Sequence, residues 1–117
     1  MTMLTRPYDA EVLFELTATR TDGKKKRVLS GYRPEYNIRP DYSTCTHHEF
    51  VGESGVETGQ SVRAHIWFLT PEIYPHTLWV GRVLKVSEGS RVVGSATITK
   101  VTNGLLLSLN EGPIDFS

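Results

Sequence analysis

The side chains best suited to chemistry lie close together between residues 45 and 49. Cys45, His47, His48 and Glu49 are of types that bind zinc, but a structural zinc site needs four converging ligands. In an extended strand alternate side chains face opposite ways, so Cys45 and His47 share one face and His48 lies on the other. Because only two of these ligands converge locally, we predict no metal site and no cofactor.

The same segment could supply a nucleophile and its base, with the thiol of Cys45 next to the imidazole of His47. The surrounding residues give no sign of an oxyanion hole or of an Asp or Asn that would orient the imidazole. A free cysteine is more often a small buried side chain than a nucleophile. We therefore expect that the protein is not an enzyme.

The strongest concentration of charge lies in residues 20–39, within a chain whose formal net charge is zero. Local positive charge of this kind is how a neutral domain builds a phosphate-binding surface. The alternative is a solvated hairpin tip, since the Asp22-Gly23 pair predicts a tight turn. Against two carboxylates, Asp22 and Glu35, the segment holds seven cations: Arg20, Lys24, Lys25, Lys26, Arg27, Arg33 and Arg39.

The elements that must position these groups are strands, because apolar residues recur at every second position, as at Val12, Phe14 and Leu16. Gly and Pro turns separate the apolar segments, and no stretch shows a sustained helical period. A series of short strands of this kind implies an all-β barrel or sandwich. The predicted strands cover residues 10–18, 27–32, 36–39, 44–51, 61–69, 78–87 and 91–101.

The strand predicted for residues 61–69 has an outward face that is partly apolar. Val62, Ala64 and Ile66 alternate toward the core, so Trp67 and Leu69 fall on the outer side. An exposed tryptophan beside a leucine would mark a protein interface. The alternative is that the leucines of residues 105–109 cover this face.

Length and composition suit one domain, since the chain has 117 residues. We assign residues 1–101 to a β-barrel domain and residues 102–117 to a C-terminal extension that could add a strand. No apolar run is long enough to span a bilayer, so we expect no membrane partner. The single cysteine and the lack of an apolar leader favour the cytoplasm.

Three further segments carry motifs: residues 21–36 contain Gly31-Tyr32-Arg33-Pro34, residues 59–66 alternate from Gly59 to Ile66, and residues 87–101 contain Glu88-Gly89-Ser90-Arg91. In this order they resemble the C-terminal domain of the bacterial elongation factor Tu family. The second segment is similar to that family's G-D-x-V-x-V-x-V strand, and the third to its closing R-E-G-G-R-T-V-G hairpin. The resemblance implies a closed antiparallel β-barrel of about six strands.

In that family this domain contacts the acceptor and T stems of aminoacyl-tRNA, the GTP-binding domain and the nucleotide-exchange factor. The resemblance places Lys24, Lys25, Arg33, Glu88 and Gly89 at RNA-contacting positions. No G-x-x-x-x-G-K-[ST] phosphate loop occurs in the chain, so we expect no bound nucleotide.

The resemblance therefore leads us to expect a non-enzymatic binding module. Its partner would be a protein of the translation apparatus, either a translation factor or a factor-binding protein, docked through Trp67 and Leu69. One alternative is weak binding of a tRNA stem or another structured RNA through residues 20–39, although the carboxylate of Glu35 would repel phosphates. Another alternative is a decoy or immunity-type protein that mimics the surface of the elongation factor.

Overall fold

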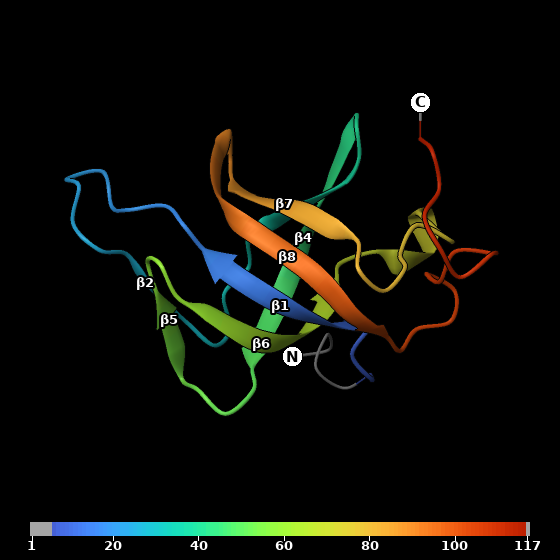
Figure 1. The fold of residues 1–117 in the computed structure, drawn as a ribbon, viewed down its shortest axis with the longest axis horizontal. Coiled ribbons are helices and arrows are strands. Elements are labelled where there is room, and N and C mark those ends of the chain that lie inside the picture. The colour runs from blue at the N-terminus through green and yellow to red at the C-terminus, as the bar shows by residue number, and fades with distance from the viewer. Residues whose placement is uncertain (1–5, 117) are drawn as a thin grey trace.

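The computed structural model describes residues 6–116 and shows a closed six-stranded β-barrel. Around the barrel the strands follow the order β1-β6-β4-β3-β7-β8, and every neighbouring pair is antiparallel (Figure 1). The predicted all-β closed barrel is therefore confirmed. Its strands are β1 (Ala10–Leu16), β3 (Glu35–Arg39), β4 (Tyr42–Phe50), β6 (Ser61–Phe68), β7 (Val83–Glu88) and β8 (Arg91–Val101).

Residues 1–5 of the predicted barrel domain and residue 117 of the predicted extension lie outside the described part of the chain. Between residues 6 and 116 the one helical segment is a 3₁₀ turn at Pro71–Ile73, labelled η2. No helix in this part of the chain is long and apolar enough to cross a bilayer.

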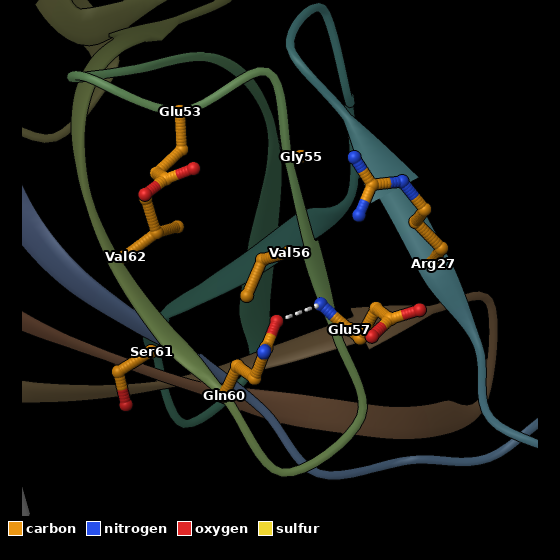
Figure 2. A pocket seen from close by; sticks show the side chains of 8 residues that line it. All are labelled: Arg27, Glu53, Gly55, Val56, Glu57, Gln60, Ser61 and Val62. Atoms are coloured by element: carbon orange, nitrogen blue, oxygen red, sulfur yellow. Dashed lines mark hydrogen bonds between the residues drawn. The ribbon is translucent and has the colours of Figure 1, made fainter.

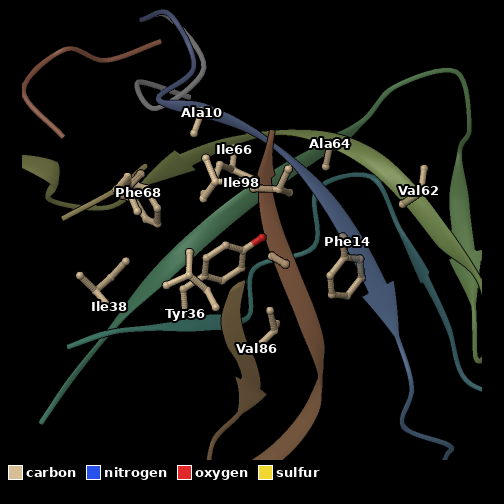
Figure 3. Close-up of a cluster of buried hydrophobic side chains, with 14 of the residues drawn as sticks. Ala10, Phe14, Tyr36, Ile38, Val62, Ala64, Ile66, Phe68, Val86 and Ile98 are labelled. Atoms are coloured by element: carbon tan, nitrogen blue, oxygen red, sulfur yellow. The ribbon is translucent and has the colours of Figure 1, made fainter. Parts of the chain in front are cut away.

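Alternation along the strands fills the inside of the barrel. Val12 and Phe14 on β1 are fully buried, whereas Leu13 between them is 43% exposed. Ile66 and Phe68 on β6 point into the same cluster (Figure 3). Burying one such side chain stabilises the fold by about 1.5–3 kcal/mol. The interior is thus a packed core.

A second, two-stranded sheet stands beside the barrel. It pairs β2 (Arg27–Leu29) with β5 (Gly55–Glu57), and Val28 lies opposite Val56. Both of these valines are buried, so the small sheet packs its apolar side inward. Its position matters for function because β2 follows directly on the loop that contains most of the lysines.

The predicted strand over residues 27–32 is too long, because β2 stops at Leu29. The next residues no longer pair with β5 and instead bond to β4. The amide of Gly31 donates to the carbonyl of His48 over 2.8 Å, and the amide of His48 donates to the carbonyl of Tyr32 over 3.0 Å. The predicted strand over residues 78–87 also begins late, at Val83, because residues 79–82 form a turn.

The C-terminal extension adds no strand within residues 102–116, so that expectation is wrong. It folds into turns and joins the loop before β7 through one parallel bridge between Leu78 and Leu107. Leu106 is fully buried and belongs to the same apolar cluster as the barrel core. The extension therefore closes one end of the barrel.

Candidate functional site

A cluster of exposed cations lies on the loop of residues 17–26, which we call the basic loop. It connects β1 to β2 and projects beyond the barrel on the side opposite the C-terminal extension (Figure 1). A short bridge between Thr19 and Lys25 joins its two limbs. The amide of Arg20 donates to the carbonyl of Lys24 over 2.8 Å, so the loop has a defined backbone.

The sequence sets the tip of the basic loop locally. Gly23 has a φ of +83°, a conformation that glycine adopts without steric cost. One carboxylate oxygen of Asp22 accepts from the amide of Lys24 over 3.0 Å, and the other accepts from the guanidinium of Arg20 over 2.7 Å. The side chains of Lys24 and Lys25 are left exposed at the tip.

The base of the basic loop is joined to the rest of the molecule by Thr58, which the sequence analysis did not single out. Its hydroxyl donates to the carbonyl of Ala18 over 2.7 Å and accepts from the amide of Lys26 over 2.8 Å. One side chain thus links both limbs of the loop. A threonine between two turn glycines carries no local signal for this role, because its partners are about 30–40 residues away in the chain.

Glu88 and Gly89, predicted to touch RNA, lie in the β7–β8 turn next to the basic loop. The Lys26 ammonium lies 3.3 Å from Oε1 of Glu88, and the Tyr32 hydroxyl donates to Oε2 over 2.5 Å. Gly89 has a φ of +60°, which the tight two-residue turn requires. In the same turn, the guanidinium of Arg91 donates to the carbonyl of Thr19.

These contacts change the pKa values of Glu88 and Tyr32. Burial would raise the pKa of Glu88, but hydrogen bonds from Tyr32 and Lys26 and the charges of Lys26 and Arg91 outweigh burial and lower it. Burial, and then the hydrogen bond to Glu88, raise the pKa of Tyr32 far above its ordinary value. Glu88 is therefore an ionised carboxylate directed at the protein.

Arg33, the remaining predicted RNA contact, lies on another part of the surface. It is exposed just before β3, and its Nε donates to Nδ1 of His47 over 3.2 Å. His47 is on the outer face of β4, so this contact places the guanidinium over that face. The structure thus brings Lys24, Lys25, Glu88 and Gly89 to the basic loop and its neighbouring turn, and Arg33 to the barrel wall.

The prediction of an exposed tryptophan is wrong. Trp67 does lie on the outer face of β6, but it is only 8% exposed. Its Nε1 donates to the carbonyl of Arg6 over 2.8 Å, and the ring of Tyr8 packs against it edge-on at 6.1 Å. The cover is therefore the segment before β1, and not residues 105–109. Leu69, the second predicted interface residue, is 58% exposed.

Asp9 holds this covering segment in place. Its buried carboxylate accepts two hydrogen bonds from Arg6, over 2.7 and 3.0 Å, and one from the amide of Phe68 over 2.8 Å. Asn103 adds a fourth over 2.9 Å, which ties the C-terminal extension to the same point. The hydrogen bond with Asp9 raises the pKa of Arg6.

The histidines of β4 lie on opposite faces, as the alternation predicts. His48 is buried; its Nδ1 donates to the carbonyl of Tyr32 over 3.1 Å, and its Nε2 accepts from the hydroxyl of Tyr36 over 2.6 Å. Burial lowers the pKa of His48 to about 4, against the smaller opposing effect of its backbone hydrogen bonds. On the outer face, Nε2 of His47 lies 2.8 Å from a carboxylate oxygen of Glu49.

Those contacts give each of the two imidazoles a structural partner. Across residues 6–116, no three His, Cys, Asp or Glu side chains gather in an arrangement that could hold a metal ion. Cys45 and His47 share the outer face of β4, but His48 is directed into the core, so the cluster seen in the sequence is divided between two environments.

A hollow of about 470 Å³ lies between the small sheet and the start of β6 (Figure 2). Arg27 lines it together with Glu53 and Glu57, and Glu57 lies opposite Arg27 in the β2–β5 register. The side chain of Gln60 accepts from the amide of Glu57 over 3.0 Å. Arg27 therefore shares the lining of this hollow with two acidic side chains, whereas Lys24 and Lys25 lie at the exposed tip of the basic loop.

Comparison with known proteins leaves the resemblance to elongation factor Tu as an expectation. No family model matches the chain, and no curated protein matches it significantly.

Proposed function

We propose that the protein is a non-enzymatic binding module that contacts the phosphate backbone of a structured RNA, such as a tRNA stem, through the basic loop. The observation that carries the proposal is the exposure of Lys24 and Lys25 at the tip of a loop whose backbone is already ordered. Lysine and arginine neutralise phosphates and release counterions, which gives affinity without sequence readout.

The shape of the loop supports an RNA backbone as the ligand. A-form RNA is recognised largely through phosphates and 2′-hydroxyls, which a projecting polar loop can reach. Residues 17–26 contain no aromatic side chain, so the loop has no platform on which an unpaired base could stack. A protein with this role in translation would act in the cytoplasm.

The number of exposed cations sets the expected affinity for RNA. Arg20 and Arg91 are also exposed on the same loop and the adjacent turn, where Arg20 pairs with Asp22 and Arg91 donates to the carbonyl of Thr19. About two to four phosphate contacts would give a dissociation constant of about 10⁻⁴–10⁻⁶ M that weakens as salt rises.

The experiment is a titration of fluorescently labelled tRNA, followed by anisotropy at about 50 and 200 mM salt. We expect Lys24→Ala combined with Lys25→Ala to weaken binding about tenfold, at about 0.7 kcal/mol for each exposed contact. The salt slope should fall by about two. The matched control is Lys85→Ala with Lys100→Ala, which removes the same charge from exposed positions on β7 and β8.

Two results would contradict the proposal. The first is an absence of binding at the lower salt concentration. The second is equal weakening by the two double variants, because a general charge effect would then replace a site at the basic loop.

Docking of a translation factor or a factor-binding protein is the second candidate function. The observation in its favour is that Leu69 and Ile73 are each 58% exposed, although Trp67 is covered. A decoy that mimics the elongation factor would use the same kind of contact. Leu69→Asp with Ile73→Asp should abolish binding of the purified nucleotide-exchange factor of elongation factor Tu; unchanged binding would exclude this surface.

A further inference from the structure

We infer that Glu88 is a positioning residue that fixes the basic loop against the barrel and does not itself contact the RNA. The inference rests on the proposed function and concerns how its binding surface is held. It assigns Glu88 a role different from the direct RNA contact that the resemblance implies.

Both carboxylate oxygens of Glu88 are used within the protein. Oε1 lies 3.3 Å from the ammonium of Lys26, and Oε2 accepts from the hydroxyl of Tyr32 over 2.5 Å. The side chains of Lys26 and Glu88 are 21% and 35% exposed, so this contact is partly shielded from water. A carboxylate held in this way faces the loop and the barrel wall.

The same turn holds the other limb of the basic loop. Arg91, which lies opposite Glu88 in the β7–β8 register, donates to the carbonyl of Thr19. Thr19 is on the outgoing limb and Lys26 on the returning limb, so the turn contacts both. Together with the link through Thr58, these contacts define the direction in which the lysines at the tip project.

The charge of Glu88 and its proposed positioning role predict opposite changes in RNA affinity when Glu88 is removed. A carboxylate beside a phosphate is repulsive, and Glu88 also neutralises Lys26, so by charge alone its removal should tighten RNA binding. If Glu88 positions the loop, its removal leaves long side chains to be ordered on binding, which costs affinity. The direction of the change therefore separates the two roles.

The test is the anisotropy titration with tRNA, applied to Glu88→Gln. We expect binding about three- to tenfold weaker than wild type, although the variant has lost a negative charge. The swapped pair, Lys26→Glu with Glu88→Lys, keeps both the net charge and the ion pair, and should return binding to within about twofold of wild type. Tighter or unchanged binding by Glu88→Gln would overturn the inference.

A swapped pair that stays as weak as Glu88→Gln would also overturn the inference, because restoring the ion pair between positions 26 and 88 would then fail to restore the binding surface. A measurement without RNA separates this inference from the proposed function. Hydrogen exchange of the amides of Arg20 and Gly23, which are bonded within the loop, should quicken in Glu88→Gln. Unchanged exchange refutes the positioning role, whereas failure of wild type to bind tRNA refutes the proposed function.

Discussion

The buried imidazole of His48 should make the barrel sensitive to mild acid. Its pKa is lowered to about 4, chiefly by burial, whereas the unfolded chain has a histidine pKa of about 6.5. Between pH 6.5 and pH 4 the imidazole of His48 is therefore protonated in the unfolded chain but neutral in the folded protein. The free energy of unfolding should fall as pH falls through this window, at up to about 1.4 kcal/mol per pH unit.

The magnitude follows from the two pKa values. Between pH 7.5 and pH 5 the loss is about 2 kcal/mol, and it reaches about 3 kcal/mol by pH 4. Glu88, whose pKa is lowered, acts in a different range. Its contribution is present above the ordinary carboxyl pKa of about 4.5 and is lost only as pH falls further, so Glu88 adds no pH dependence between pH 7.5 and pH 5.

Urea unfolding followed by circular dichroism at pH 7.5, 6 and 5 measures this loss. His48→Gln should be less stable than wild type at pH 7.5 but almost independent of pH over the same range. Ile98→Val is the matched control, because it trims a buried core side chain without removing a titrating group, so its pH dependence should equal that of wild type. NMR titration of the wild-type imidazole provides a second readout if the glutamine variant does not fold.

A change in wild-type stability of less than about 0.5 kcal/mol between pH 7.5 and pH 5 would contradict this prediction. The prediction would also be refuted if His48→Gln kept the full slope, since another group would then be responsible. An imidazole that titrates near pH 6.5 in the folded protein would show that the ring is hydrated.

Two further predictions concern how the barrel is closed, and thermal or urea unfolding measures both. Gly94→Ala would place a Cβ 2.0 Å from the backbone oxygen of Glu15, so we expect a loss of about 3 kcal/mol, whereas Gly104→Ala, which meets no atom within 4 Å, should change little. Leu106→Ala should cost about 2–4 kcal/mol because this side chain is fully buried, whereas the 84%-exposed Leu109 should tolerate alanine. Equal effects of the two leucine variants would show that the C-terminal extension is not part of the core.

Much of the fold could be predicted from local pattern. Strand alternation depends only on which side each residue faces, so Val12, Phe14 and Leu16 identify a core-facing strand without any knowledge of their neighbours. The turns at Gly23 and Gly89 could be predicted for the same reason, because a positive φ is a property of one residue. The predicted strand ends were less accurate, because a strand ends where its partner strand stops, as β2 does at Leu29.

The covering of Trp67 could not be read from the chain. The strand period places its ring on the outer face correctly, but its exposure depends on Arg6 and Tyr8, about sixty residues earlier. The contact requires the buried carboxylate of Asp9 to hold that segment, and an acidic residue before a strand carries no local sign of burial.

The amino-acid sequence by itself determined that this chain forms a small all-β domain with a basic turn between its first two strands. Both properties follow from residues close together in the chain. Only the tertiary structure decided which of those cations remain available, because Lys26 meets Glu88 across a long stretch of sequence. Charge can be counted along a chain, but whether a charge is neutralised depends on pairing distances that exist only once the barrel has closed.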